Sequence, residues 1–184
     1  MQSKTNWVMV DEATSGGSQL PVGAYVARIT DVEDHPRDEY LLVTWDVAEG
    51  EHAGHYSDDY GKRNPYTHQF RRYYSEKSAR FFKSFLVQLE QSNRGRFSVE
   101  EWNARQDERE FVGLEIGVLV QTRQYTNTKG DDKSVNEVRE TCAAQDVRNG
   151  DYTMPAPIDQ RKKIDPREDE TSKGAYYADD SVPF

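Results

Sequence analysis

Cysteine is almost absent from this chain, since its 184 residues contain only Cys142. A single cysteine cannot form an internal disulfide or a zinc site built from cysteines, which agrees with a reducing compartment. Because Cys142 lies among small and apolar residues, we expect a buried side chain that behaves as a small hydrophobe.

Long apolar runs are missing as well. No stretch approaches the roughly 18 residues that a membrane span needs. The first residues, MQSKTNWVMVDE, lack the apolar core of a secretion signal. We therefore expect a cytoplasmic protein with no membrane partner.

The motifs of common enzyme classes are also missing. The sequence has no phosphate-binding glycine loop, nucleophile elbow or paired catalytic motif. One polar bend contains potential ligands, His52, His55, Asp58 and Asp59, at a spacing that could chelate a divalent cation. No residues near that bend are positioned to orient these ligands through hydrogen bonds, so we do not expect a metal there. We expect His35 and His68 to lie at the surface. The sequence thus predicts no enzyme, no metal site and no cofactor.

Apolar residues are scarce overall, at 35% of the chain with a mean hydropathy of -0.98. Such a chain cannot pack into a core along its whole length. Residues 1–20 end in a cluster of Gly, Ser and Pro, which predicts a flexible N-terminal arm. Residues 151–184 hold four of the seven prolines and few aliphatic residues, which predicts a disordered acidic tail. One domain, residues 21–150, remains between them.

The first part of this domain predicts three strands. Residues 23–34 and 40–50 alternate between apolar and polar side chains, as half-buried strands do. In the second strand we assign alternate residues to the core: Leu41, Val43, Trp45 and Val47. Residues 55–60 and 68–74 flank a turn signal, which indicates a long or broken third strand.

The second part predicts a helix and a closing hairpin. Ser75 is a suitable N-cap, and residues 93–95 end the helix. Its apolar residues recur at helical spacing and are expected in the core: Phe81, Phe82, Phe85, Leu86 and Leu89. A short helical turn follows at residues 99–104, and two strands flank the turn at residues 126–132. This is the element order of a mainly β, five-stranded OB-fold barrel with one α-helix between the third and fourth strands.

Positive charge is concentrated in the middle of an otherwise acidic molecule. Residues 61–97 contain nine Lys/Arg and two Glu, a local balance of +7, whereas the whole chain has a net charge of -9. Cations interleaved with aromatic rings are typical of surfaces that bind single-stranded nucleic acid, because the cations neutralise phosphates and the rings stack on bases. Because the isoelectric point is near 5.0, the protein as a whole repels nucleic acid, and binding has to be confined to this basic part of the surface. The alternative is a strand and an amphipathic helix whose rings are core and whose charges are only solvated.

The third strand offers two sets of side chains. Phe70, Arg72 and Tyr74 share one side, and the sequence does not say whether this side or the other faces the barrel. We expect Tyr40, Tyr66 and Tyr73 to stack on bases and the cations to bind phosphates, with the last hairpin loop in a secondary role. The candidate DNA-binding residues are Arg28, Tyr40, Lys62, Arg63, Tyr66, Phe70, Arg71, Arg72, Tyr73, Tyr74, Lys77, Arg123, Lys129 and Lys133.

The last residues read DDSVPF. This segment resembles the acidic C-terminal tip of bacterial single-stranded DNA-binding proteins. The resemblance implies a partner-binding role for Asp179, Asp180, Val182, Pro183 and Phe184, toward a helicase, primase, polymerase, nuclease or recombinase. An apolar pocket and a cation can capture such a ring and carboxylate, and the aspartates steer the tip toward a basic rim. The alternative is an acidic end that only improves solubility.

A second resemblance concerns the domain before the tail and is based on four segments: GAY at residues 23–25, VAEGEHAGHY at 47–56, FFKSFLVQLEQSN at 81–93 and VRNGDYTMP at 147–155. In these the chain resembles phage-encoded single-stranded DNA-binding proteins of the OB-fold type, although its first hairpin loop, residues 34–39, is acidic. The resemblance implies protection of single-stranded DNA during phage replication or recombination, in the cytoplasm of an infected bacterium. An adaptor or decoy that uses the tip without binding DNA is the alternative, and assembly into a homo-oligomer stays open.

Overall fold

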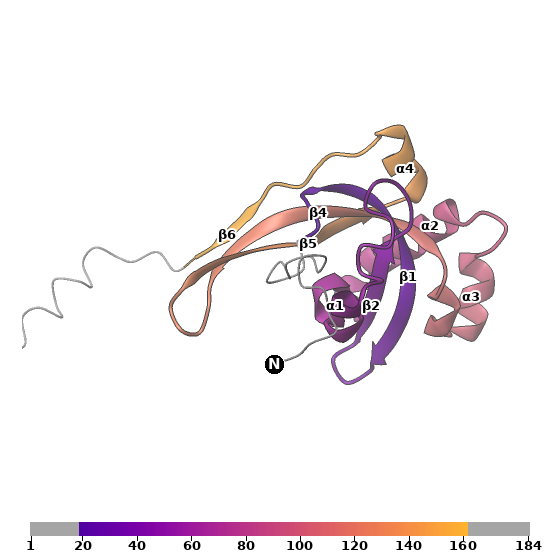
Figure 1. The fold of residues 1–184 in the computed structure, drawn as a ribbon. Coiled ribbons are helices and arrows are strands. Elements are labelled where there is room, and N and C mark those ends of the chain that lie inside the picture. The colour runs from indigo at the N-terminus through magenta and orange to yellow at the C-terminus, as the bar shows by residue number, and fades with distance from the viewer. Residues whose placement is uncertain (1–18, 162–184) are drawn as a thin grey trace, which may run out of the picture.

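The computed structural model describes residues 19–161, which form a mainly antiparallel β-sheet with most of the helices at one end (Figure 1). The strands are β1 (Gly23–His35), β2 (Tyr40–Val47), β3 (Gln69–Tyr73), β4 (Glu115–Thr126), β5 (Asp132–Cys142) and β6 (Ile158–Gln160). Their order across the sheet is β3-β2-β1-β4-β5, and β6 pairs in parallel with β4. No strand pairing within residues 19–161 joins β3 to β5, so the sheet is not closed.

The first hairpin confirms the alternation read from the sequence. Ala27 and Ile29 of β1 are buried while Arg28 is exposed, and the expected core residues of β2 are all buried: Leu41, Val43, Trp45 and Val47. A register shift between Ile29 and Asp31 bulges β1 and brings Val32 into the core. The hairpin therefore presents one apolar face to the interior along its whole length.

The third strand is shorter than expected. Residues 55–60, predicted to be extended, form a turn that leads into the helix α1 (Asp59–Arg63), and the 3-10 helix η2 (Pro65–His68) precedes β3. The carboxylate of Asp58 accepts a hydrogen bond from the amide of Gly61 at 2.7 Å, as an N-cap does. Gly61 is buried against the carbonyl of Tyr56 and has no room for a Cβ atom. This cap and this glycine are the reasons that a helix replaces the strand.

The central helical segment contains the expected helix and the expected helical turn at residues 99–104, together with two 3-10 helices. It comprises η3 (Glu76–Ser78), α2 (Ala79–Ser92), α3 (Val99–Arg105) and η4 (Glu108–Phe111). Phe85, Leu86 and Leu89 are buried, as the spacing predicted. Phe81 is not: 62% of its surface is exposed, and the guanidinium of Arg80 lies 4.7 Å from its ring centroid. The apolar stripe of α2 is therefore narrower than the sequence indicated.

Asn93 joins the end of α2 to the start of β4. Its amide nitrogen donates to the carbonyls of Leu89 and Glu115, both at 2.8 Å, and its amide oxygen accepts from the Glu115 N–H at 2.9 Å. Asn93 is only 5% exposed. One buried side chain thus caps the helix and fixes where the next strand begins.

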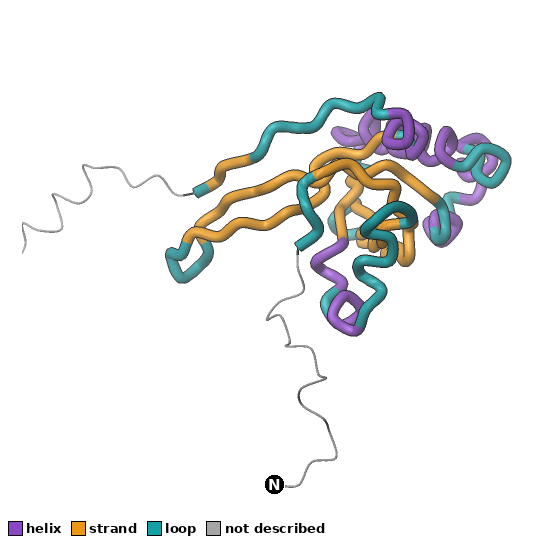
Figure 2. Tube along the Cα trace, turned by 45° about the horizontal axis from the view of Figure 1, so that its top comes forward, coloured by secondary structure: helices purple, strands orange, loops and turns teal. Residues whose placement is uncertain are grey.

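The hairpin of β4 and β5 extends away from α2 and α3, toward the opposite side of the molecule, as Figures 1 and 2 show. We call its distal part, residues 121–137, the arm. β6 runs along β4 in the arm, with Arg123 paired to Ile158 and Tyr125 to Gln160. Residues 158–160 were predicted to lie in the disordered tail, so the ordered chain continues past residue 150.

The start of the domain also differs from the expectation. Leu20, which was assigned to the flexible N-terminal segment, is 1% exposed and belongs to the core. Residues 1–18 and 162–184, which make up the rest of both predicted terminal segments, lie outside the described part.

α4 (Ala144–Asn149) follows β5 and covers Gly117, where a Cβ would meet the Cys142 sulfur at 2.6 Å. Cys142 is partly buried, and burial raises the pKa of its thiol to about 11. No helix within residues 19–161 has the length and apolar character to cross a membrane.

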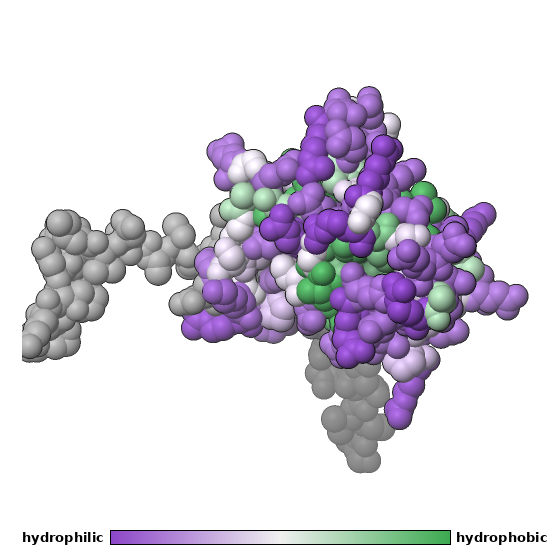
Figure 3. All heavy atoms as spheres, turned by 90° about the vertical axis from the view of Figure 1, so that its right-hand side faces the viewer, coloured by the Kyte–Doolittle hydropathy of each residue, from purple (hydrophilic) through white to green (hydrophobic). Residues whose placement is uncertain are grey.

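The side of the molecule formed by α2 and α3 is mostly hydrophilic. Figure 3 looks onto this side and shows a small group of hydrophobic residues near its centre. A shallow groove of about 430 Å³ lies here, lined by apolar side chains that include Leu41, Phe82 and Trp102, with Asp34 and Glu108 at its rim. Its carboxylates make it a poor surface for phosphates.

Candidate nucleic-acid interface

The strand pairing of β2 with β3 settles which side of β3 faces outward. Tyr40 pairs with Tyr73, and two residues further along Leu42 pairs with Arg71. Arg71 and Tyr73 are exposed, whereas Phe70, which precedes Arg71, and its β2 partner Val43 are buried. We call the outward set the outer face; its members are Tyr40, Leu42, Gln69, Arg71 and Tyr73, and it ends at the buried Thr44. Three of the predicted site residues are thereby brought together.

Rings and a cation cluster at one end of the outer face. The Arg71 guanidinium lies 5.0 Å from the ring centroid of Tyr40, and the rings of Tyr40 and Tyr73 are 5.4 Å apart. Tyr40 also stacks on His35, at 4.5 Å between centroids and 13° between planes. Tyr73 is 45% exposed. A flat, partly exposed ring held beside a cation is suited to stack on a base while the cation meets a phosphate.

The other set on this strand, Phe70, Arg72 and Tyr74, is less exposed than the outer face. Phe70 is 7% exposed in the core, and the guanidinium of Arg72 lies 4.6 Å from the Phe70 ring and 5.4 Å from the Phe85 ring. Burial lowers the pKa of Arg72 to about 10, so it remains a cation at neutral pH. Tyr74 donates a hydrogen bond to Asp34 at 2.7 Å and packs on Phe82. Phe70 is therefore too buried to stack on a base, whereas Arg72 and Tyr74 are partly exposed and their contact with DNA stays a prediction.

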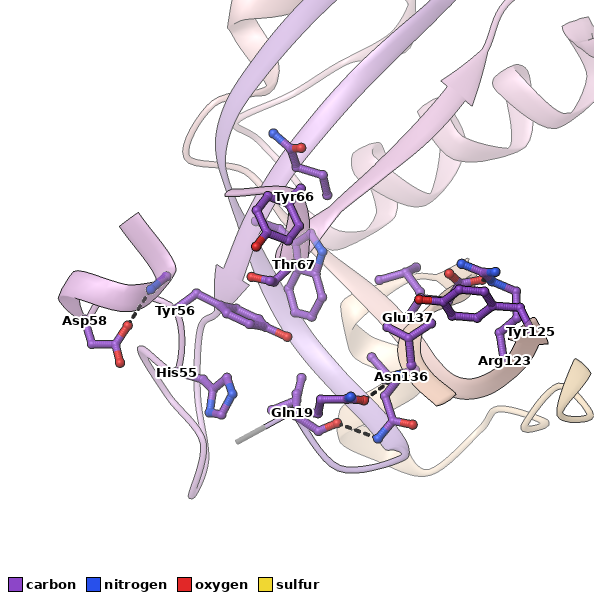
Figure 4. A pocket seen from close by; sticks show the side chains of 17 residues that line it. Gln19, His55, Tyr56, Asp58, Tyr66, Thr67, Arg123, Tyr125, Asn136 and Glu137 are labelled. Atoms are coloured by element: carbon purple, nitrogen blue, oxygen red, sulfur yellow. Dashed lines mark hydrogen bonds and ion pairs between the residues drawn. The ribbon is translucent and has the colours of Figure 1, made fainter. Parts of the chain in front are cut away.

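A groove of about 680 Å³ continues from the outer face toward the arm. Gln69 belongs to both surfaces, so they are continuous. Figure 4 shows the groove between the segment that carries Tyr56 and Tyr66 and the arm residues Arg123 and Tyr125. Its lining residues are Gln19, Leu20, Trp45, His55, Tyr56, Asp58, Gly61, Tyr66, Thr67, Gln69, Val120, Arg123, Tyr125, Val135, Asn136, Glu137 and Val138.

The arm contributes a ring and a cation to this groove. The guanidinium of Arg123 lies 4.7 Å from the ring centroid of Tyr125 and forms an ion pair with Glu137 at 2.9 Å. Arg139 contacts the same carboxylate at 3.0 Å. These two arginines share one glutamate, and Arg123 and Glu137 are the charged residues that the arm contributes to the groove lining.

On the opposite wall, Tyr66 is the most exposed large ring of residues 19–161, at 69%. Its hydroxyl donates to the side chain of Asn64 at 2.9 Å, which holds the ring at the rim. Tyr56 lies deeper, stacked on His68 with 4.4 Å between ring centroids. His68 is buried, so the expectation that it lies at the surface is wrong.

The remaining candidates are more scattered. Arg28 forms an ion pair with Glu115 at 3.1 Å, on the side covered by α4. Lys62 and Arg63 end α1 beside the groove, Lys77 lies in η3 after the outer face, and Lys129 and Lys133 lie at the tip of the arm. Within residues 19–161, no three His, Cys, Asp or Glu side chains gather as a metal site would require. The tip residues Asp179, Asp180, Val182, Pro183 and Phe184 lie outside the described part.

Sequence reasoning missed several residues of the groove. Tyr56, Tyr125 and Asn136 carried no signal in the sequence, because the turn and the arm that position them depend on long-range packing. Trp45 was correctly assigned to the core but not to the groove floor. The alternation of β2 gives its burial, whereas only the structure shows that the core opens into a cavity beside it.

Comparison with known proteins adds no family assignment. No protein-family model matches the chain, and a search of curated proteins finds no match. The geometry of the outer face and the groove therefore carries the functional inference.

Proposed function

We propose that this protein binds single-stranded DNA along a path that runs over the outer face and into the groove. The observation that carries the proposal is the placement of Tyr40, Arg71 and Tyr73 on one exposed face, continuous through Gln69 with a groove rimmed by Tyr66. Single strands expose the faces of their bases, so rings in a row beside cations favour them over duplex. The acidic remainder of the protein opposes nonspecific binding elsewhere.

We further propose that the sheet is a partly open OB-fold barrel. The strand order β3-β2-β1-β4-β5 supports this, because it leaves β3 and β5 as the two ends that a barrel would bring together. Arg72 of β3 donates a hydrogen bond to the Thr141 hydroxyl of β5 at 2.9 Å, so the two ends are near each other. In OB-folds, strands 2 and 3 and the loop between strands 4 and 5 form the nucleic-acid surface, which corresponds to the outer face and the arm.

The proposed role is that of a single-stranded DNA-binding protein in phage replication or recombination. The residues from Asp179 to Phe184 would recruit replication or recombination enzymes to the covered strand, as the resemblance of the tip implies. An adaptor that uses the tip and binds no DNA would need no ordered set of exposed rings on β2 and β3. The outer face thus favours the DNA-binding role.

Fluorescence anisotropy with labelled oligo-dT, compared with a duplex of the same length, tests the proposal. We expect binding to the single strand, weaker binding to the duplex, and an affinity that falls with salt at a slope of about -0.7 per phosphate contact. The double variant Arg71→Glu/Tyr73→Ala should lower the affinity about a hundredfold or more, since it removes one stacking ring and reverses one charge.

Arg94→Glu is the matched control, because Arg94 is an exposed cation in the loop after α2 and changes the net charge equally. It should alter the affinity much less than Arg71→Glu alone. Equal effects of the two charge reversals would mean that only the overall charge matters. Retention of oligo-dT by the Arg71→Glu/Tyr73→Ala variant would exclude the outer face.

A further inference from the structure

We infer that the groove contains a subsite for one nucleobase, which Tyr56 recognises by donating its hydroxyl hydrogen to a carbonyl oxygen of the base. The inference rests on the proposed function and deepens it. The path as a whole would accept any base, whereas this one subsite would discriminate between bases. The observation behind it is a rigidly held hydroxyl group that points into a groove of mixed polar and apolar lining.

Three contacts fix the ring of Tyr56. One face stacks on His68, at 4.4 Å and 15°, and Trp45 meets the ring edge-on at 5.5 Å. The backbone N–H of Tyr56 donates to the carboxylate of Asp46 at 2.9 Å. A side chain fixed in this way loses little conformational entropy when a ligand binds, so its hydrogen bond contributes more to selectivity.

The Tyr56 hydroxyl is available to a ligand. Figure 4 shows it pointing into the groove, toward the space between Thr67 and Asn136. Among the described side chains of residues 19–161, which exclude those of Asp59 and Tyr60, it has no hydrogen-bond partner. The amides of Asn136 and the hydroxyl of Thr67 are already paired within the protein. Burial raises the pKa of Tyr56 to about 12, with Asp46 adding to the effect. The group is thus a neutral donor at physiological pH.

A second donor lies in the floor of the same groove. Trp45 is 2% exposed, and its indole Nε1 is buried with no acceptor in the described part of the chain. A buried donor without an acceptor is rare, because it forfeits the hydrogen bond that it makes with water when unfolded. Because this Nε1 atom is buried, the Tyr56 hydroxyl and not the indole N–H is the donor open to a ligand in the groove.

The rest of the cavity suits the flat faces of a base. Leu20, Val120 and Val138 form an apolar wall, and Tyr66 stands at the rim, where the neighbouring base of the strand would stack. The volume of about 680 Å³ lies within the range of sites that hold drug-sized ligands. A thymine fits this pattern best, because it offers carbonyl oxygens to donors and an apolar methyl group to the wall.

The test compares two oligonucleotides of equal length and charge. One is oligo-dT, and in the other each thymine is replaced by 2,4-difluorotoluene, which has the shape of thymine but lacks its carbonyl oxygens. We expect the wild-type protein to bind oligo-dT about three- to tenfold more tightly, as one net hydrogen bond implies. Tyr56→Phe should remove this difference by weakening oligo-dT binding alone. Tyr66→Phe is the matched control, because its hydroxyl is already bonded to Asn64 at the rim, and it should retain the difference.

The outcomes separate this inference from the proposed function. Equal binding of the two oligonucleotides by the wild type, together with a salt-dependent affinity, would overturn the subsite and leave the DNA-binding role intact. An equal loss for both oligonucleotides in Tyr56→Phe would also overturn it, since the hydroxyl would then act on folding or on the path as a whole. Absence of salt-dependent binding to either oligonucleotide would overturn the proposed function, and the subsite with it.

Discussion

Arg72 and Thr141 lie at opposite ends of the sheet order, yet the guanidinium of the first donates a hydrogen bond to the hydroxyl of the second at 2.9 Å. Thr141 in turn donates to the side chain of Gln88 on α2 at 2.7 Å and accepts from it through its backbone carbonyl at 2.9 Å. One chain of hydrogen bonds thus joins β3, β5 and α2. It brings the two free ends of the sheet together where their backbones do not pair.

The first prediction concerns the cost of this buried cation. Within the described part of the chain Arg72 forms no ion pair with a carboxylate, and its guanidinium lies against the rings of Phe70 and Phe85. We expect Arg72→Met to leave the free energy of unfolding unchanged or to raise it, because methionine keeps the contact with the rings and removes a charge that is costly to bury. Arg72→Ala should lower it by about 2 to 3 kcal/mol, since it leaves a cavity. Urea denaturation of both variants measures the difference.

Both variants should change the affinity for oligo-dT less than Arg71→Glu does, because Arg72 is less exposed than Arg71. A loss of more than about 2 kcal/mol in Arg72→Met would show instead that the charged hydrogen bond is essential for holding β3 beside β5.

The second prediction concerns Asn93, which makes three hydrogen bonds between α2 and β4. Asn93→Ala leaves the N–H and carbonyl of Glu115 without these partners, so we expect a loss of about 2 to 4 kcal/mol in the free energy of unfolding. Gln145→Ala is the control, because Gln145 also has a side-chain amide bond, to Asn149, but at an exposed position on α4. It should change stability by less than about 0.5 kcal/mol. Similar losses in the two variants would refute the role of Asn93.

The third prediction concerns acid. His68 is buried, and burial lowers its pKa from the usual value of 6.5; His55 adds to this shift and Asp46 opposes it. As the pH falls through 6.5, the unfolded chain takes up a proton at His68 while the folded protein remains neutral there. The unfolded state then binds more protons, so the folded state loses stability until the pH reaches the lower folded pKa.

His68→Phe keeps a ring against Tyr56 and removes this titration. Between about pH 7.5 and pH 5, the melting temperature of the wild type should therefore fall more steeply than that of His68→Phe. Carboxylates titrate equally in both proteins, so the difference between the two profiles isolates His68. Parallel profiles would mean that His68 is hydrated in the folded protein.

The sequence predicted those elements whose pattern depends on neighbouring residues. β1 and β2 alternate between core and solvent, and β4 and β5 flank a turn rich in Asn, Gly and Asp, so each was found near its observed position. α2 was found from its apolar spacing, but that spacing cannot set the width of the buried stripe. Phe81 lies at the edge of this stripe, and its exposure depends on how far the neighbouring elements reach.

The candidate site was predictable only in part, for a related reason. The sequence identified Tyr40, Arg71 and Tyr73, because charge and aromatic content mark a strand whichever way it faces. It could not tell that Phe70 and Arg72 face inward, because a strand with polar residues on both sides has no clear apolar face. That assignment follows from the register with β2, a contact between segments about 30 residues apart.

The last prediction separates the groove from exposed aromatic surface in general. Tyr66 and Phe81 have similar exposure, 69% and 62%, and neither ring belongs to the core. Tyr66 lies at the rim of the groove, whereas Phe81 lies on α2 beside Arg80. Tyr66→Ala should weaken oligo-dT binding by about 1 to 3 kcal/mol, the contribution of one stacked base, at unchanged stability. Phe81→Ala removes a ring of similar size next to a cation and should leave the affinity unchanged. Anisotropy titrations of both variants at one salt concentration measure the contrast, and a comparable loss in Phe81→Ala would place the bound strand on α2 instead of the groove.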